Sequence, residues 1–229
     1  MLIGLTGKYC AGKNYVASLL EARGLPVLDV DKVGYIALDS RKEEIFARFG
    51  RDVQKPDGTV DRRLLGEKVF GKPAELAALE AIVHPEANRM TEEWAAKYKT
   101  CVINAALLHR SVLFDKLDRI IVVTAPLFTR LARARKRDGL SWITLFTRFL
   151  RQRKFDSQYL AAKAEIYIVE NSGKSKDFPV GKSRDFPEEE PKDFPVGKPR
   201  GFASTETMQK FRSSREKLER RLDKILEGI

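Results

Sequence analysis

A glycine-bearing loop near the start of the chain has residues that could bind phosphate. Residues 7–14, GKYCAGKN, lie between an apolar run at 2–6 and a helical pattern that begins near residue 16. The two glycines permit a tight turn, so successive backbone N–H groups can face phosphate oxygens at a helix N-terminus. Lys13 would reach the β- and γ-phosphates of a nucleotide as a point charge. Because a phosphate-binding P-loop requires a strand, a loop and a helix in this order, we favour it over a glycine turn with a chance lysine.

Two carboxylates follow the second apolar run. Asp29 and Asp31 come at the end of a strand expected over 26–31, where α/β sheets place their ligand chemistry. Period-two spacing in an extended segment would aim both side chains to the same side. One could accept a proton from a substrate hydroxyl while the other holds a metal or caps the next helix. A purely structural role for Asp31, as the N-cap of residues 32–38, fits the pattern equally well.

The last position of the loop bears on metal binding. Asn14 stands where a serine or threonine normally places a hydroxyl on Mg²⁺. An Asn carbonyl oxygen is an acceptable hard ligand, although the side chain is bulkier and needs a different rotamer. We therefore expect Asn14 and Asp29 to be the Mg²⁺ ligands.

The net charge of +11 is concentrated in one stretch. Residues 126–163 carry ten basic and two acidic side chains, which gives +8. Arg133, Arg137 and Arg148 could neutralise charge on a transferring phosphoryl group, whereas the ordinary meaning of such a run is a solvated basic face. A nucleic-acid-binding module is a further alternative, but the aromatic residues of this stretch have the spacing of an amphipathic helix core rather than of a stacking platform.

The sequence gives little support for a zinc site, a histidine-based catalytic site or a membrane-spanning segment. Cys10 and Cys101 lie in no zinc-binding spacing, and His84 and His109 have no partners for a catalytic or metal constellation. Followed by a proline, His84 is most simply a core or turn histidine. No run approaches the ~18–20 apolar residues that a membrane span needs. We expect a cytoplasmic protein without membrane contact.

Short apolar runs separated by helical patterns predict the elements that position these residues. Five strands of a parallel sheet are expected at 2–6, 26–31, 101–103, 120–123 and 166–169. Residues 42–98 are mostly helical in pattern, with a break or kink at Pro85. Basic helices are expected at 126–137 and 141–154.

The pattern changes after residue 171. Asp-Phe-Pro recurs from residues 177, 185 and 193 at a period of eight, in a segment rich in proline, glycine and lysine. Residues 172–203 therefore predict a disordered linker, and the repeats within 174–203 could bind a protein partner. Residues 204–229 predict an amphipathic helix whose apolar stripe packs on the core.

Taken together, these positions resemble the dephospho-CoA kinase family over residues 1–171. The resemblance is carried by IGLTG at 3–7, GK at 12–13, LDVDK at 28–32, FG at 49–50, GEKVF at 66–70, LEAIVHP at 79–85, RDGLS at 137–141, Arg148 and Gln152. It implies an α/β fold of the P-loop NTPase, nucleoside-kinase-like type: a five-stranded parallel sheet, a helical CoA-binding subdomain at about 42–98 and a lid at about 126–163. It also implies ATP-dependent phosphorylation of the ribose 3′-hydroxyl of dephospho-CoA, with ATP and Mg²⁺.

Roles carry over from the family position by position. The ATP phosphates would be bound by Cys10, Ala11, Gly12, Lys13, Asn14 and Tyr15. Asp31 would act as general base toward the 3′-hydroxyl, with Lys13, Arg137 and Arg148 as the other catalytic residues. His84 would lie on the substrate side with Asp31.

The chain also departs from the family pattern. Lys8, Tyr9 and Cys10 replace a more glycine-rich loop, and Asn14 and Tyr15 replace hydroxyl residues. The family's acidic and proline positions near a Pro-Leu-Leu segment are Asn104, Ala106 and Arg110 here. The alternative function is therefore a catalytically impaired P-loop protein that binds nucleotide or CoA without transfer.

Overall fold

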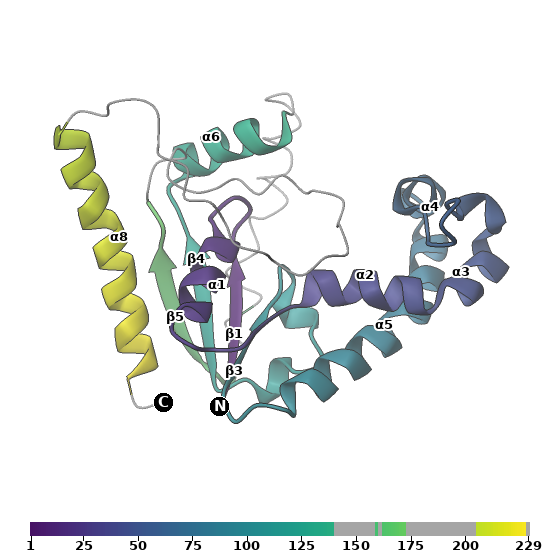
Figure 1. The fold of residues 1–229 in the computed structure, drawn as a ribbon, viewed down its shortest axis with the longest axis horizontal. Helices are drawn as coiled ribbons and strands as arrows, with labels where there is room; N and C mark the ends of the chain where they lie inside the picture. The colour runs from purple at the N-terminus through teal and green to yellow at the C-terminus, as the bar shows by residue number, and fades with distance from the viewer. Residues whose placement is uncertain (140–158, 160–161, 173–204, 228–229) are drawn as a thin grey trace.

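The protein folds around a five-stranded parallel sheet, seen in a computed structural model that describes residues 1–139, 159, 162–172 and 205–227 (Figure 1). The strands are β1 (Leu2–Gly7), β2 (Val27–Asp29), β3 (Cys101–Asn104), β4 (Arg119–Thr124) and β5 (Glu165–Glu170). Their order is β2-β3-β1-β4-β5, and every pairing is parallel. The predicted fold class is confirmed.

Continuous apolar runs form the central strands because both of their faces are covered. All four residues of β3 and the inner four of β4 are buried. On one face, β1 and β4 pack against α1 (Lys13–Glu21). On the other face they pack against the segment between β3 and β4, which contains the short 3₁₀ helices η2 (Leu108–Arg110) and η3 (Phe114–Lys116).

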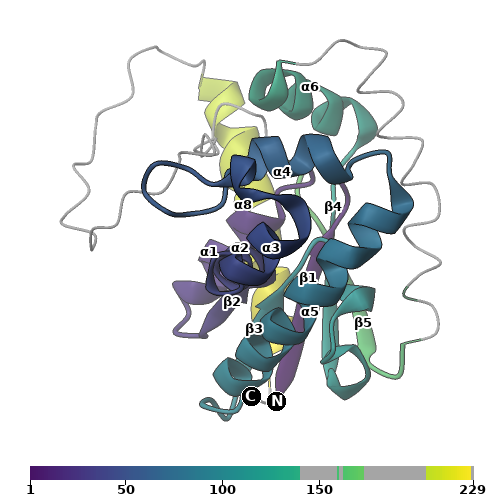
Figure 2. The same cartoon turned by 90° about the vertical axis from the view of Figure 1, so that its right-hand side faces the viewer.

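A helical arm projects from the β2 side of the sheet (Figures 1 and 2). It consists of α2 (Val30–Ser40), α3 (Lys42–Phe49), η1 (Arg51–Val53), α4 (Arg62–Val69) and α5 (Pro73–Ala95). The arm has a hydrophobic cluster of its own, centred on Ile45, Phe46 and Leu65. These helices therefore form a small subdomain around a core of its own, against which Leu28 of β2 also packs.

The structure corrects two expectations about this arm, a break at Pro85 and a core or turn position for His84. Helix α5 runs through Pro85 without a break, although a proline inside a helix removes one backbone hydrogen bond. His84, one residue earlier, is exposed in the middle of that helix and is neither a core nor a turn histidine. Packing of α5 against α2 and α4 keeps the helix continuous where its local sequence predicts an interruption.

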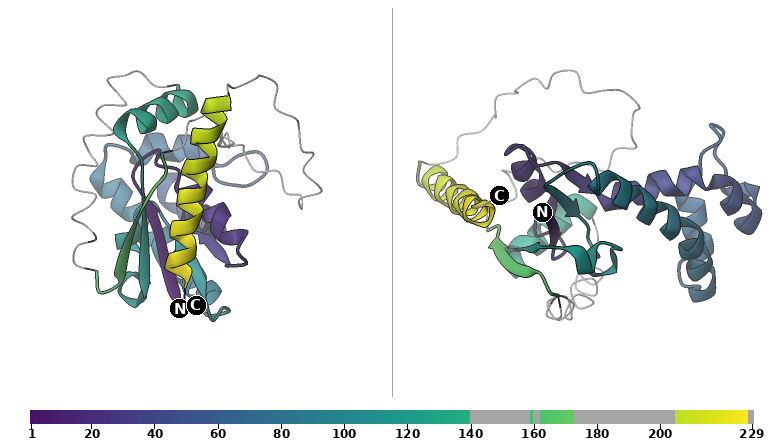
Figure 3. Two further views of the ribbon diagram at one scale, coloured as in Figure 1. Left: turned by 90° about the vertical axis from the view of Figure 1, so that its left-hand side faces the viewer. Right: turned by 90° about the horizontal axis from the view of Figure 1, so that it is seen from below.

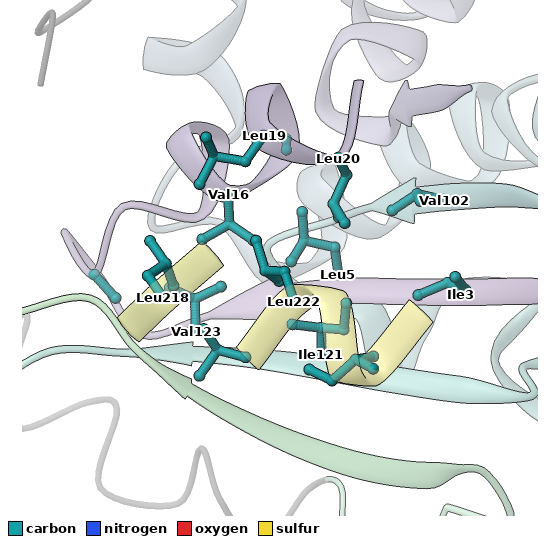
Figure 4. Close-up of a cluster of buried hydrophobic side chains, with 14 of the residues drawn as sticks. Ile3, Leu5, Val16, Leu19, Leu20, Val102, Ile121, Val123, Leu218 and Leu222 are labelled. Atoms are coloured by element: carbon teal, nitrogen blue, oxygen red, sulfur yellow. The ribbon is translucent and has the colours of Figure 1, made fainter. Parts of the chain in front are cut away.

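The last helix, α8 (Thr205–Leu226), lies beside β5 (Figure 3). Its residues Leu218, Leu222 and Ile225 are buried in the cluster that also holds α1 and the sheet. Figure 4 shows Leu218 and Leu222 among Val16, Ile121 and Val123. The C-terminal end of the chain thus completes one face of the core.

The basic stretch begins with α6 (Leu127–Asp138). The second expected basic helix at 141–154, together with Arg148, and the linker at 172–203 lie outside the described residues, apart from Ser172. Within 1–139, 162–172 and 205–227, no helix combines the length and apolarity that a membrane crossing requires.

Candidate active site

Parallel pairing brings the predicted site residues to one edge of the sheet. In register, Asn104 at the end of β3 pairs with Leu5 of β1 on one side and with Asp29 of β2 on the other. The loop at residues 8–12 leaves this same edge and leads into α1. The carboxyl ends of the strands are where α/β sheets bind ligands, so the loop and the carboxylates meet where that rule places a site.

The loop ends in a helix start that is open to an anion. Gly12 precedes α1 with a left-handed φ of 93°, and no side chain caps the helix. The first N–H groups of a helix have no partner within the helix, and its dipole favours negative charge there. The N-terminus of α1 can therefore accept phosphate.

The side chain of Lys13, the first residue of α1, is largely shielded from solvent. Its side chain is 13% exposed, and Nζ lies 3.6 Å from Oδ2 of Asp31, whose side chain is 54% exposed. Burial lowers the pKa of Lys13, while the nearby Asp31 and Asp29 carboxylates oppose that shift. Among the described residues, Nζ has no hydrogen-bond partner. A phosphate oxygen would provide one.

Asp29 and Asp31 do not share one extended segment, contrary to the expectation from their spacing. Strand β2 ends at Asp29, whose Oδ1 accepts the N–H of Asp31 at 3.1 Å and caps α2. Asp31 lies in the first helical turn, so Asp29 is the N-cap and the structural role considered for Asp31 is wrong. The carboxylate of Asp31 therefore does not cap the helix, and it lies 3.6 Å from Nζ of Lys13.

Two amides lie next to the loop. The Nδ2 of Asn104 donates to Oδ1 of Asn14 at 3.4 Å, and Asn104 is 2% exposed. In the described part of the chain, Oδ1 of Asn104 is buried without a hydrogen-bond partner. Mg²⁺ prefers oxygen ligands and usually keeps several waters and substrate phosphates. The carbonyl oxygen of Asn104, which lacks a hydrogen-bond partner among the described residues and lies beside Asn14, suits such an ion. The described residues contain no group of three His, Cys, Asp or Glu side chains that could hold a metal ion elsewhere.

Arg137 reaches the loop but is held by its neighbour. Its Nε donates to Oδ1 of Asp138 at 2.7 Å, and its guanidinium lies 5.1 Å from the ring centroid of Tyr9. The Tyr9 hydroxyl also donates to Asp138. The hydrogen bond to Asp138 raises the pKa of Arg137, which keeps it a cation. Neither Tyr9 nor Asp138 carried a sequence signal for this contact, because they lie far apart in the chain.

Arg133 occupies a different position from the one expected of a phosphoryl-neutralising residue. It is 8% exposed and donates to the main-chain carbonyl oxygens of Cys10, Ala11 and Asn171. Its guanidinium therefore binds the loop itself. Asn171, which the sequence marked only as the end of the resemblance, joins this contact.

The remaining predicted residues are less directly placed. His84 lies exposed on α5 in the arm, whereas Lys13 and Asp31 lie at the sheet edge. Tyr15 follows in α1 and is partly buried against the core. Arg148 lies outside the described residues.

A parallel sheet, a glycine loop that opens a helix with a buried lysine, and a carboxylate facing that lysine define a P-loop kinase. Comparison with known proteins narrows this class. The sequence profile of dephospho-CoA kinase matches residues 1–177. The dephospho-CoA kinase of Anaeromyxobacter dehalogenans is 36% identical over 180 residues, covering 75% of this chain and 84% of that protein. The chain belongs to the dephospho-CoA kinase family.

Other relatives agree in sequence and in fold. The dephospho-CoA kinase of Thermus thermophilus is 34% identical over 182 residues, 77% of this chain and 86% of its own. The crystal structure of TT1252 from the same organism superposes with a TM-score of 0.61 at 33% identity, covering 76% of this chain and 89% of that one. A dephospho-CoA kinase structure from Campylobacter jejuni, at 23% identity and a TM-score of 0.54, shares the fold; it covers 77% of this chain and 90% of its own.

Proposed function

We propose that this protein transfers the γ-phosphoryl group of ATP to the ribose 3′-hydroxyl of dephospho-CoA, giving coenzyme A and ADP. The observation that carries the proposal is the pairing of Lys13 with Asp31 at 3.6 Å beside the P-loop. In this arrangement a buried ammonium group, which suits phosphate, lies next to an exposed carboxylate, which suits a hydroxyl substrate. Membership of the dephospho-CoA kinase family supports the choice of substrate.

The residues of the site have two kinds of role: some stabilise negative charge on the phosphates, and Asp31 orients the attacking hydroxyl. The backbone of residues 10–15 and the ammonium of Lys13 bind the phosphates of ATP. Asp31 orients the 3′-hydroxyl and accepts its proton as the oxygen attacks phosphorus. Arg137, released from Asp138, and Arg148 stabilise negative charge on the transferring group.

A divalent cation fits the oxygen atoms at the sheet edge. Mg²⁺, when bound with ATP, neutralises phosphate charge. The amide oxygens of Asn14 and Asn104 would hold it, with Asp29 supplying a carboxylate oxygen from the neighbouring strand. Both amides are neutral, so we expect most of the affinity for the ion to come from the nucleotide.

The arm and the basic stretch would serve the two substrates. We propose that the helices within 42–98, with His84, form the dephospho-CoA side, and that residues 126–163 form a lid over the triphosphate. Residues 1–171 would be the kinase unit, with 172–203 as a linker and 204–229 as a helix that packs on the core. The linker repeats could bind a protein partner, and we propose a cytoplasmic location.

The direct test is turnover. The protein incubated with ATP, Mg²⁺ and dephospho-CoA should yield coenzyme A and ADP in equal amounts, measured by chromatography and mass. Other ribose and nucleoside acceptors in the same assay should give much slower ADP release. Absence of any acceptor that gains one phosphate, with an active positive control, would refute the proposal.

Asn14 separates a working kinase from a protein that only binds nucleotide. We expect Asn14→Thr to change kcat by less than about tenfold, because an amide oxygen and a hydroxyl are both adequate hard ligands. A large gain from near-zero turnover would instead show that Asn14 impairs the native chain. Titration of Mg²⁺ at fixed ATP in both variants supplies the second readout.

A further inference from the structure

Two side chains from the C-terminal half of the sheet domain hold the P-loop from one side. Arg133 of α6 donates through Nη1 to the carbonyl oxygens of Ala11 at 3.0 Å and Cys10 at 3.3 Å, and through Nη2 to that of Asn171 at 3.1 Å. Asn171, just after β5, donates through Nδ2 to the same Ala11 oxygen at 2.9 Å. We propose that Arg133 and Asn171 are positioning residues that fix the P-loop backbone in its phosphate-binding conformation before nucleotide binds.

Their burial shows that this contact is built into the fold. Arg133 is 8% exposed and Asn171 is 2% exposed. Within the described residues, Arg133 is the only buried arginine. Removing a guanidinium from water is costly unless its donors find partners, so a buried arginine bound to three carbonyl oxygens indicates a specific requirement for that geometry.

The bonds determine which way the loop's N–H groups point. In a trans peptide the carbonyl oxygen and the following N–H point in opposite directions. Because the Ala11 oxygen is held by Arg133 and Asn171, the N–H of Gly12 must point away from them. The N–H of Ala11, fixed in the same way by the Cys10 oxygen, closes the turn on the Lys8 oxygen at 2.9 Å. The two residues thus fix the orientation of successive peptide planes in the anion-binding loop.

The loop also has a backbone conformation that needs such support. Cys10 has a φ of 57°, and it is the only residue other than glycine with a positive φ in the described part of the chain. A side chain with a Cβ is disfavoured there and persists where the surroundings determine the conformation. Arg133 supplies that constraint through the Cys10 carbonyl.

Gly12 has a related requirement. A Cβ at Gly12 would lie 2.3 Å from Nδ2 of Asn171, and its φ of 93° is itself left-handed. Only glycine lets Asn171 approach the Ala11 oxygen closely enough to bond. The glycine of the motif therefore serves the contact with Asn171 as well as the turn.

The test measures nucleotide binding at equilibrium, which rests on the proposed ATP site but requires no phosphoryl transfer. Variants Asn171→Ala, Arg133→Lys and Arg133→Gln are compared with the wild type by calorimetry with ATP and, separately, with dephospho-CoA. We expect the Kd for ATP to rise about tenfold or more in each, in line with lost buried hydrogen bonds, and the Kd for dephospho-CoA to change by less than about twofold. Hydrogen exchange of residues 7–14 without nucleotide should become faster.

Two comparisons separate positioning from simple charge and from unfolding. Arg133→Lys keeps the charge, but one ammonium cannot span the three carbonyl oxygens, so it should not restore affinity. Arg135→Gln removes the same charge from an exposed position on α6, and its effect on the ATP Kd should be several times smaller than that of Arg133→Gln. Asn171→Ala changes no charge and carries the test if an Arg133 variant does not fold.

The outcomes are distinct. Folded variants with unchanged ATP affinity and unchanged exchange of residues 7–14 would overturn the inference. So would full rescue by Arg133→Lys, or an equal loss for both substrates. A wild-type protein that binds ATP but transfers nothing would refute the proposed function and leave the positioning role intact.

Discussion

Lys13 and Asp31 form an ion pair that nucleotide and substrate would have to reorganise in the proposed reaction. At 3.6 Å their separation exceeds an ordinary hydrogen bond, and Asp31 is largely exposed while Lys13 is not. The carboxylate can therefore turn to a substrate hydroxyl while the lysine turns to phosphate. At the residue scale, this pair is the centre of the proposed chemistry.

Asp31→Asn should remove the proton acceptor while keeping the shape of the site. We expect kcat to fall by about 10²- to 10⁴-fold, the usual contribution of general base catalysis, with little change in KM for ATP. Steady-state kinetics with both substrates varied provides the measurement.

The matched control is Asp39→Asn, at the far end of the same helix. Oδ1 of Asp39 accepts the N–H of Val60 at 3.1 Å, a bond that an asparagine oxygen can keep. This variant should retain wild-type kcat. An equal loss in both variants would assign the effect of Asp31→Asn to the helix rather than to proton transfer.

Arg137 is a second residue whose availability depends on a neighbour. Asp138 binds its guanidinium and also accepts from Tyr9, so the arginine is paired when no nucleotide is bound. Asp138→Asn should weaken this pairing and lower the Kd for ATP by about two- to fivefold, within the range of partly exposed ion pairs. Calorimetry measures the change.

A double-mutant cycle isolates the Arg137 contribution. In an Arg137→Gln background, Asp138→Asn should have a much smaller effect on ATP affinity. The same gain in both backgrounds would show that Asp138 acts through its charge on the nucleotide and not by holding Arg137.

At the scale of elements, the arm depends on a carboxylate at the contact between α5 and the start of α3. Glu86 of α5 accepts from Arg89 at 2.6 Å and from Arg41, between α2 and α3, at 3.1 Å. These hydrogen bonds lower the pKa of Glu86 to about 2. The ion pair therefore links helices that the sequence places 45 residues apart.

The pH dependence of stability follows from that lowered pKa. A carboxyl group with a depressed pKa in the folded state stabilises the fold above its unfolded pKa, 4.5, and loses that contribution as the pH falls toward about 2. Glu86→Gln should lower the thermal midpoint at pH 7, and the difference from wild type should shrink between pH 4.5 and 2. A difference that stays constant over this range would assign the effect to packing. Calorimetric scans across the range provide the measurement.

At the scale of the whole molecule, α8 and the start of the chain share one core. Leu222 is fully buried with Val16 of α1 and Ile121 of β4 (Figure 4). The helix therefore belongs to the folded unit although the family match ends at residue 177. The family match ends at residue 177, whereas the hydrophobic core extends to Ile225. The two boundaries differ because the match follows shared motifs, while the core includes every side chain that is buried in it.

Leu222→Ala should cost about 2–5 kcal/mol of unfolding free energy, because it leaves a cavity among packed side chains. Denaturant unfolding measures the change. Leu107→Ala, at a side chain that is 53% exposed, should cost under about 1 kcal/mol. Similar values for the two would show that α8 does not contribute to the core.

Local pattern predicted the strands well because buried parallel strands are continuous apolar runs. The runs at 101–103 and 120–123 are the cores of β3 and β4, and that at 166–169 lies in β5. The same local pattern predicted the ends of the helices less accurately. Val30 begins α2 instead of continuing β2, because the Asp29 side chain caps a helix there. Pro85 lies inside α5 because packing outweighs its local preference.

The amino-acid sequence alone indicated the strands of the sheet, the P-loop and Lys13, since these depend on short-range spacing, and it distinguished Asp31 from Asp29 only through the family resemblance. Only the tertiary structure decided which distant groups meet them. Asn104 reaches Asn14 across 90 residues, Asp138 binds Tyr9 across 129, and Asn171 binds Ala11 across 160. Contacts of this kind leave no periodicity in the sequence, because strand order and helix packing create them when the chain folds.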